Sequence, residues 1–169
     1  MSTPTLSIQE QAERWGAEAK RLSDSGRELA ALDLYRKAAD ALPGAPWLQH
    51  RTAEVARKLK RDELAIAYFR RSAAAFRKAG FDKRAVSPLR LAWTIARCDL
   101  AQFGETFLDT AQDLSQLLGA LGLHADAEST LEETEDALRR AGLGRLLQDT
   151  LSAPRSTTSV YPTMRPQSA

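Results

Sequence analysis

The sequence has few of the residues from which disulfides and membrane segments are built. Cys98 is its only cysteine, which excludes an intramolecular disulfide and favours a reducing, cytoplasmic location. No run of about 18 apolar residues occurs, which excludes a transmembrane helix. The first fifteen residues lack the basic and apolar segments that direct export, so we expect no secretory signal peptide.

Aromatic residues are also scarce, at 7% of the 169 residues, and long alternating runs of Val, Ile and Thr are absent. Such runs are typical of β-strands, whereas Ala and Leu, which supply most of the apolar residues, favour helices. Apolar residues make up 43% of the sequence and charged residues 27%, as in an ordinary soluble protein. The composition therefore predicts one all-α domain.

Candidate catalytic and metal-binding residues are sparse. The two histidines, His50 and His124, fall on different predicted helices and have no cysteine nearby. The acidic run from Glu132 to Asp136 places adjacent carboxylates on different faces of a helix, so we interpret it as solvated charge. No glycine-rich phosphate loop follows a strand. We expect no enzymatic activity, no metal ion and no cofactor.

Charge is unevenly distributed, although the net charge is only +2. Residues 51–90 contain twelve Lys and Arg against four Asp and Glu, whereas residues 99–152 contain three against eleven. The two segments can present fields of opposite sign, which would permit head-to-tail self-association. The alternative is that both are solvated outer faces that keep a helical array in solution.

A two-helix pattern occupies residues 12–43. Its small and aromatic residues recur at spacings that bring two helices face to face. The pattern consists of Trp15, Ala19, Leu22, Gly26, Ala31, Tyr35, Ala38 and Pro43. Gly26 would form the turn between the helices, and Pro43 would end the second. One such pair cannot bury its own apolar stripe, so further copies are expected.

Weaker copies of the pattern follow along the chain. About 34 residues later, the corresponding positions are held by Ala53, Ala65 and Phe69. In this copy Gln49 replaces the tryptophan, and the turn has no glycine. A further copy of the pattern, around Gly80, is shifted by about half a period, so it includes residues of the fourth predicted helix. Another copy surrounds Gly122. The sequence leaves open whether the fourth helix closes one pair, opens the next or does both.

The periodicity predicts seven or eight helices. Ser7 is a candidate N-cap for the first, which should run over residues 8–23, and Pro46 suits the first position of the third. The fourth is expected over residues 63–79. Because proline removes a backbone hydrogen bond, a kink or a fresh start is expected at Pro88 inside the fifth.

The predicted domain organisation has three parts. Residues 1–7 are expected to be frayed, residues 8–152 to form the helical domain, and residues 153–169 to be a disordered tail rich in Pro, Ser and Thr. Within the domain, residues 145–151 should form a short helix that covers the last apolar face. Cys98 is expected to be a buried, inert thiol.

These repeats resemble those of the tetratricopeptide repeat (TPR) family, of bacterial type. The resemblance is strongest over residues 12–43 and extends over roughly residues 8–141. It implies a right-handed superhelical array of antiparallel helix pairs, about three to four repeats, whose concave face binds a peptide or a partner helix. The overlap at the fourth helix is similar to TPR segments of bacterial multidomain regulators. The absence of asparagine argues against the Asn/Lys clamp with which co-chaperone members hold a C-terminal carboxylate.

The predicted binding site lies on the helix faces that would line the concave surface. In the first two pairs these faces hold eight candidate contact residues, Glu13, Lys20, Trp47, His50, Arg51, Glu54, Arg57 and Lys58. Gly16 and Ser23 belong to the same faces. A tryptophan beside arginine and lysine is the composition of an interaction hot spot. The alternative is that Trp47 packs on the first pair as part of the core.

The leading functional hypothesis is a non-catalytic adaptor or scaffold that binds an acidic or amphipathic segment of another protein. One alternative is a TPR-type secretion chaperone that holds an apolar export substrate, although the groove residues are mostly polar. Another is a nucleic-acid surface on the basic segment, against which the acidic second half argues. No membrane partner is expected.

Overall fold

The computed structural model describes residues 6–152, which form eight helices and no strand. The helices are α1 (Ile8–Asp24), α2 (Glu28–Ala41), α3 (Pro46–Lys58), α4 (Asp62–Lys78), α5 (Asp82–Arg97), α6 (Leu100–Ala120), α7 (His124–Arg140) and α8 (Arg145–Ser152). The expectations about residues 1–5 and about the tail from residue 153 onward lie outside the described residues.

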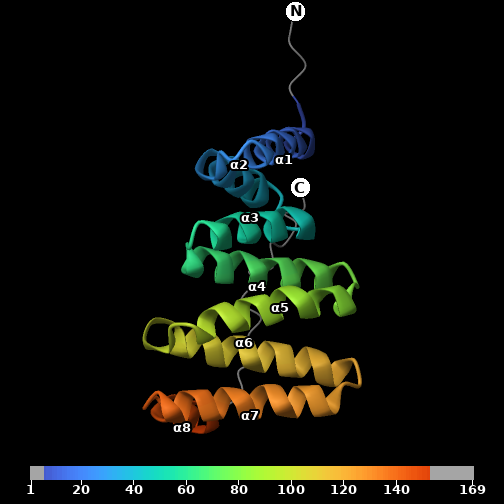
Figure 1. The fold of residues 1–169 in the computed structure, drawn as a ribbon. Coiled ribbons are helices and arrows are strands. Elements are labelled where there is room, and N and C mark those ends of the chain that lie inside the picture. The colour runs from blue at the N-terminus through green and yellow to red at the C-terminus, as the bar shows by residue number, and fades with distance from the viewer. Residues whose placement is uncertain (1–5, 153–169) are drawn as a thin grey trace, which may run out of the picture.

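The helices form a stack in which each of α1 to α7 runs antiparallel to its neighbours in the chain and packs against them (Figure 1). α4 packs as extensively on α5 as on α3, so it closes one pair and opens the next. α8 folds back against α6. The all-α array of antiparallel pairs is therefore confirmed, and the predicted short last helix is present, while the handedness of the superhelix stays a prediction.

Side-chain contacts also join alternate helices, which arranges the odd-numbered and even-numbered helices in two layers. The contacts are Trp47 against Gly16, Trp93 Nε1 to Thr134 Oγ1 at 2.9 Å, Arg71 Nη1 to Asp40 Oδ1 at 2.8 Å and Arg70 Nη2 to Asp113 Oδ2 at 3.1 Å. The first two join α1 to α3 and α5 to α7, and the last two join α2 to α4 and α4 to α6. Each layer is thus held together across the intervening helix.

Local sequence signals explain where several helices begin. The Ser7 hydroxyl accepts a hydrogen bond from the Glu10 backbone N–H, and the Glu10 carboxylate accepts one from the Ser7 N–H, which completes a capping box on α1. Pro46 occupies the first turn of α3, where its missing N–H costs little. The carboxylate of Asp99 caps α6 by accepting from Gln102 N–H, a cap that the sequence analysis missed.

The turns after α1, α3, α4, α6 and α7 share one backbone arrangement. In the first of them the N–H of Arg27 donates to the carbonyl of Leu22 and the N–H of Gly26 to that of Ser23, as in a Schellman motif. Gly26 has φ 77°, a left-handed conformation that glycine adopts without a steric penalty. The turn between α3 and α4 has the same bonds, but Lys60 holds the left-handed position with φ 56°.

Replacing Lys60 with glycine is expected to stabilise the fold by about 0.5–1 kcal/mol. The left-handed conformation costs a residue with a side chain about 1–2 kcal/mol, a cost that glycine avoids. Glycine loses more chain entropy on folding, but this loss offsets only part of the stabilisation. Urea denaturation of the wild type and Lys60→Gly measures the difference. The neighbouring Arg61 has φ −93°, so Arg61→Gly should give no stabilisation. Equal stabilisation by both substitutions would contradict the explanation.

The core is built from small residues at helix crossings and larger side chains between them. Ala19, Ala31 and Ala38 are completely buried, which confirms the close approach of α1 and α2. The buried residues form two clusters, and α4 contributes to both, with Phe69 in the larger one and Ala73 in the smaller one. The helix shared by two pairs is therefore also shared by the two parts of the core.

Of the expectations about the fifth helix, a fresh start at Pro88 and a buried Cys98 are wrong, while a kink at Pro88 stays a prediction. α5 continues through Pro88 to Arg97, so no new helix starts at the proline. Pro88 is fully buried, and the packing of the helix outweighs the single backbone hydrogen bond that proline cannot form. Cys98 is exposed rather than buried, because it is the C-cap of α5 and its sulfur lies near the carbonyl of Thr94.

Candidate partner-binding groove

The eight predicted contact residues lie on two adjacent helices. α1 carries Glu13 and Lys20, and α3 carries the other six. The two helices meet where Trp47 covers Gly16: a Cβ placed on Gly16 would lie 2.9 Å from Trp47 Cη2 and 3.1 Å from Leu48 Cδ2. The glycine therefore permits the close contact of α1 with α3. Gly16 was predicted to line the groove, but it is buried beneath this tryptophan.

Trp47 is both a packing residue and an exposed one. One edge of its indole lies on Gly16, while 48% of the residue remains exposed to solvent. The interpretation that Trp47 packs on the first pair is thus partly correct, and its contact with a partner stays a prediction. A large aromatic ring that is held in place by its own fold and still half exposed is suited to contact a second molecule with little loss of conformational entropy.

His50 lies beside Trp47 in the groove and is held in its neutral form. Its ring meets the ring of Phe69 edge-on at a centroid distance of 5.3 Å, and its Nε2 lies 3.7 Å from Glu54 Oε1. Burial lowers the pKa of His50, although the carboxylate of Glu54 opposes that shift. Its Nδ1 is buried and has no hydrogen-bond partner among the described residues. His50 therefore contributes mainly an aromatic surface near neutral pH.

Ion pairs neutralise most of the groove's positive charge. Lys20 Nζ lies 2.6 Å from Asp24 Oδ2, Arg51 Nη1 lies 2.8 Å from Glu54 Oε2, and Lys58 Nζ lies 3.3 Å from Glu28 Oε1. The hydrogen bond to Asp24 raises the pKa of Lys20. Among residues 6–152, Arg57 is the one groove cation for which no ion pair forms. The groove is therefore nearly balanced in charge.

Two polar residues outside the eight predicted contact residues also lie close to them. Tyr35, on α2, is buried, and this burial raises its pKa. The nearby cations Arg51 and Lys20 oppose the shift. Glu28 comes from the start of α2 and reaches Lys58 on α3. The spacing between Lys20 and Asp24 could have indicated their pairing, whereas no sequence signal relates Glu28 to Lys58, thirty residues away.

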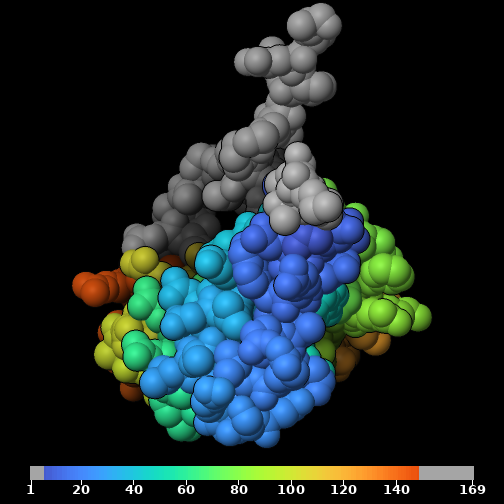
Figure 2. Space-filling model, turned by 90° about the horizontal axis from the view of Figure 1, so that it is seen from above, coloured from blue at the N-terminus to red at the C-terminus, as the bar shows by residue number. Residues whose placement is uncertain are grey.

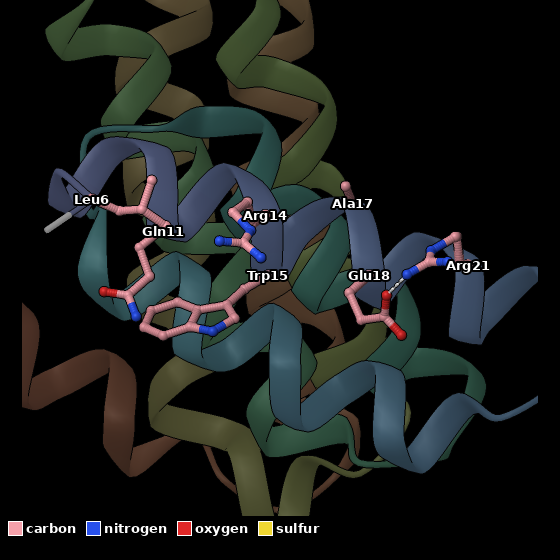
Figure 3. Close-up of a pocket in the computed structure, with 7 residues that line it drawn as sticks. All are labelled: Leu6, Gln11, Arg14, Trp15, Ala17, Glu18 and Arg21. Atoms are coloured by element: carbon pink, nitrogen blue, oxygen red, sulfur yellow. Dashed lines mark hydrogen bonds and ion pairs between the residues drawn. The ribbon is translucent and has the colours of Figure 1, made fainter. Parts of the chain in front are cut away.

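A separate hollow of about 540 Å³ runs along α1 (Figure 3). It is lined by Leu6, Gln11, Arg14, Trp15, Ala17, Glu18 and Arg21. Trp15, which the sequence placed in the core, is half-buried at this hollow, and the ammonium of Lys37 lies 5.0 Å from its ring centroid. The hollow shares none of the eight predicted contact residues, so α1 presents two distinct surfaces.

The basic and acidic segments of the chain pair with each other within the same molecule. Arg70 pairs with Asp113 at 3.1 Å, Arg90 with Asp126 at 3.4 Å and Arg97 with Glu133 at 3.3 Å. Farther along α7, Glu135 and Asp136 pair with arginines one turn away. Part of the uneven charge in the sequence therefore serves contacts between helices of one chain, and self-association through these charges stays a prediction.

Within residues 6–152, no group of three or more His, Cys, Asp or Glu side chains is placed to hold a metal ion. None of the described helices is both long enough and apolar enough to cross a membrane.

No known family model matches the sequence, and no curated protein matches it. Among solved structures, the fold is similar to that of BtubC (BKLC) from P. vanneervenii, with a TM-score of 0.48 and 12% sequence identity. That match covers 99% of this chain and 75% of the BtubC chain.

Proposed function

We propose that this chain is a non-catalytic TPR-like adaptor of bacterial type, which binds a segment of a partner protein across the groove between α1 and α3. The observation that carries the proposal is Trp47, fixed on Gly16 and 48% exposed at the centre of the predicted contact residues. Repeated helix pairs use such a surface, rather than a catalytic constellation, to bind peptides and helices.

The charge balance of the groove indicates the kind of segment that it binds. Because Lys20, Arg51 and Lys58 already have carboxylate partners, a purely acidic peptide would have to displace those carboxylates. An amphipathic segment would instead cover Trp47 with an apolar side chain and exchange hydrogen bonds with the paired charges at the rim. Of the two segment types predicted from the sequence, the geometry favours the amphipathic one.

Replacing Trp47 with serine is expected to reduce recovery of the partner at least tenfold, since a central aromatic anchor contributes about 2 kcal/mol or more to an interface. The measurement is a quantitative pull-down from native lysate with wild type and variant at equal loading. Leu29→Ser is the matched control, because Leu29 is 62% exposed and lies at the start of α2, outside the groove. Undiminished recovery with Trp47→Ser, or an equal loss with Leu29→Ser, would refute the site.

A further inference from the structure

The turn between α4 and α5 carries an exposed aromatic side chain. Phe81 is 50% exposed and stands at the N-cap of α5, at the edge of the stack where α4 turns back (Figure 1). Seen from the end of the array, green atoms of this part of the chain project from one side of the molecule (Figure 2). Phe81 therefore lies, half exposed, in a turn at the edge of the stack.

Four cations flank Phe81 in the sequence. Arg77 and Lys78 end α4, and Lys83 and Arg84 begin α5. All four are exposed, and none forms an ion pair with any residue between 6 and 152. The guanidinium of Arg84 lies 5.2 Å from the Phe81 ring centroid. We name these four cations together with Phe81 the α4–α5 tip; Asp82 is its one acidic neighbour.

Helix stability does not explain all of these charges. Cations are favoured in the last turn of a helix, which accounts for Arg77 and Lys78 on α4. In a first turn they oppose the helix dipole, yet Lys83 and Arg84 occupy the first turn of α5. Among α1 to α7, α5 alone has Lys or Arg there. Residues that are unfavourable for local helix stability and have no compensating partner are candidates for function.

We propose that the α4–α5 tip contacts the surface of an anionic lipid bilayer. An exposed aromatic ring needs a soft apolar medium to enter, and the flanking cations would then meet the negatively charged headgroups. Single-stranded nucleic acid also uses cations and aromatic rings, but it stacks successive bases on several rings, whereas the tip has one. Surface contact requires no membrane-spanning helix, but it departs from the expectation, drawn from the sequence, of no membrane partner. The tip shares no residue with the α1–α3 groove, so this proposal is independent of the adaptor function.

The opposite edge of the molecule provides a built-in control. The turn between α3 and α4 also carries four cations, Arg57, Lys58, Lys60 and Arg61. They are followed by Asp62 and Glu63, and Leu59 is partly buried, so no large apolar side chain is exposed there. If charge alone attracted the protein to lipid, both turns would contribute similarly. If the tip is the contact, only the α4–α5 turn should matter.

The test is flotation of the purified full chain with two kinds of vesicle, one of phosphatidylcholine alone and one containing about one-third phosphatidylglycerol. The wild type should float with the anionic vesicles only. Lys83→Glu/Arg84→Glu should weaken this binding at least 25-fold, at about fivefold per lost cation, and Phe81→Ser should weaken it about tenfold. The control pair Lys60→Glu/Arg61→Glu should retain binding within about threefold of wild type. Circular dichroism confirms that each variant is folded.

Several results would overturn the proposal. They are failure of the wild type to float, equal loss in the two charge-reversal pairs, and binding that is unchanged by Phe81→Ser. Polyuridine is titrated in parallel. Tight polyuridine binding that depends on the same tip residues, without flotation on anionic vesicles, would assign the tip to nucleic acid instead. Because Trp47 is intact in all of these variants, the pull-down of the partner protein tests the adaptor function independently of the lipid-binding result.

Discussion

Phe69→Ala is expected to lower the free energy of unfolding by about 3–5 kcal/mol, the largest loss for any single truncation considered. Phe69 is completely buried and is among the largest such side chains in the structure. It belongs to both overlapping sets of repeat positions and lies on α4, which packs against α3 and α5 alike. Its truncation therefore removes contacts from two helix pairs at once.

Truncation of Phe69 also removes its edge-on contact with the ring of His50. The cavity that remains adds to the lost transfer free energy by an amount that depends on how far the surrounding side chains relax. The position of the measured loss within the range for Phe→Ala therefore reports that relaxation.

Urea denaturation followed by circular dichroism measures this loss, and Phe81→Ala is the matched control. The same substitution at a half-exposed position should cost only about 1 kcal/mol, because less apolar surface is buried there. Similar losses for the two variants would show that Phe69 is not the shared core residue described above.

Gln49→Glu is expected to destabilise the protein by about 3 kcal/mol or more near neutral pH. Gln49 is fully buried, and its Nε2 donates to the carbonyl of Ala39 at 2.7 Å, close to the carbonyl of Leu42 at 3.4 Å. It thus satisfies the carbonyl of Ala39, whose partner four residues on would be Pro43, which has no N–H; the carbonyl of Leu42 also accepts from the N–H of Ala45. A carboxylate at this position has no proton to donate and would face the same two oxygens.

The destabilisation by Gln49→Glu should depend on pH. Burial beside carbonyl oxygens raises the pKa of the introduced carboxyl above its unfolded value, because only the protonated form can donate. The folded state then binds more protons than the unfolded state, so stability relative to wild type falls as pH rises from the unfolded pKa through the folded one.

Thermal unfolding of Gln49→Glu and wild type at about pH 5 and about pH 8 tests this sign, with the larger deficit expected at the higher pH. Gln116→Glu, at an exposed position on α6, is the control and should change stability by no more than about 0.5 kcal/mol at either pH. A deficit for Gln49→Glu that is constant with pH would rule out the proposed charge burial.

The helices and their turns could be predicted because their signals are local. Ser7, Gly26 and Pro46 each act within one turn of their own position, and the periodic alanines mark the faces that pack. The prediction was wrong for Cys98, since apolar neighbours in sequence do not determine which side of a helix end faces solvent. It was also wrong for a fresh start at Pro88, where tertiary packing decides.

The helices that carry the eight candidate residues could be predicted, but the contacts of those residues could not, and their role in binding stays a prediction. The eight residues do lie on adjacent helices, because repeat periodicity assigns them to the same layer. That Gly16 is covered by Trp47, and that Lys58 is neutralised by Glu28, depend on contacts between residues about thirty positions apart. No local pattern encodes such contacts.

The position of α4 in two helix pairs also bears on how the array loses its structure. In a solenoid whose repeats meet only at their borders, unfolding can begin at one end and stop at the next border. Here the border between the second and third pairs is replaced by a helix that belongs to both, with core residues in both apolar clusters. Melting of α4 would remove packing from α3 and α5 alike, so we expect the middle of the array to unfold more cooperatively than its ends, where α1 packs mainly on α2 and α8 on α6.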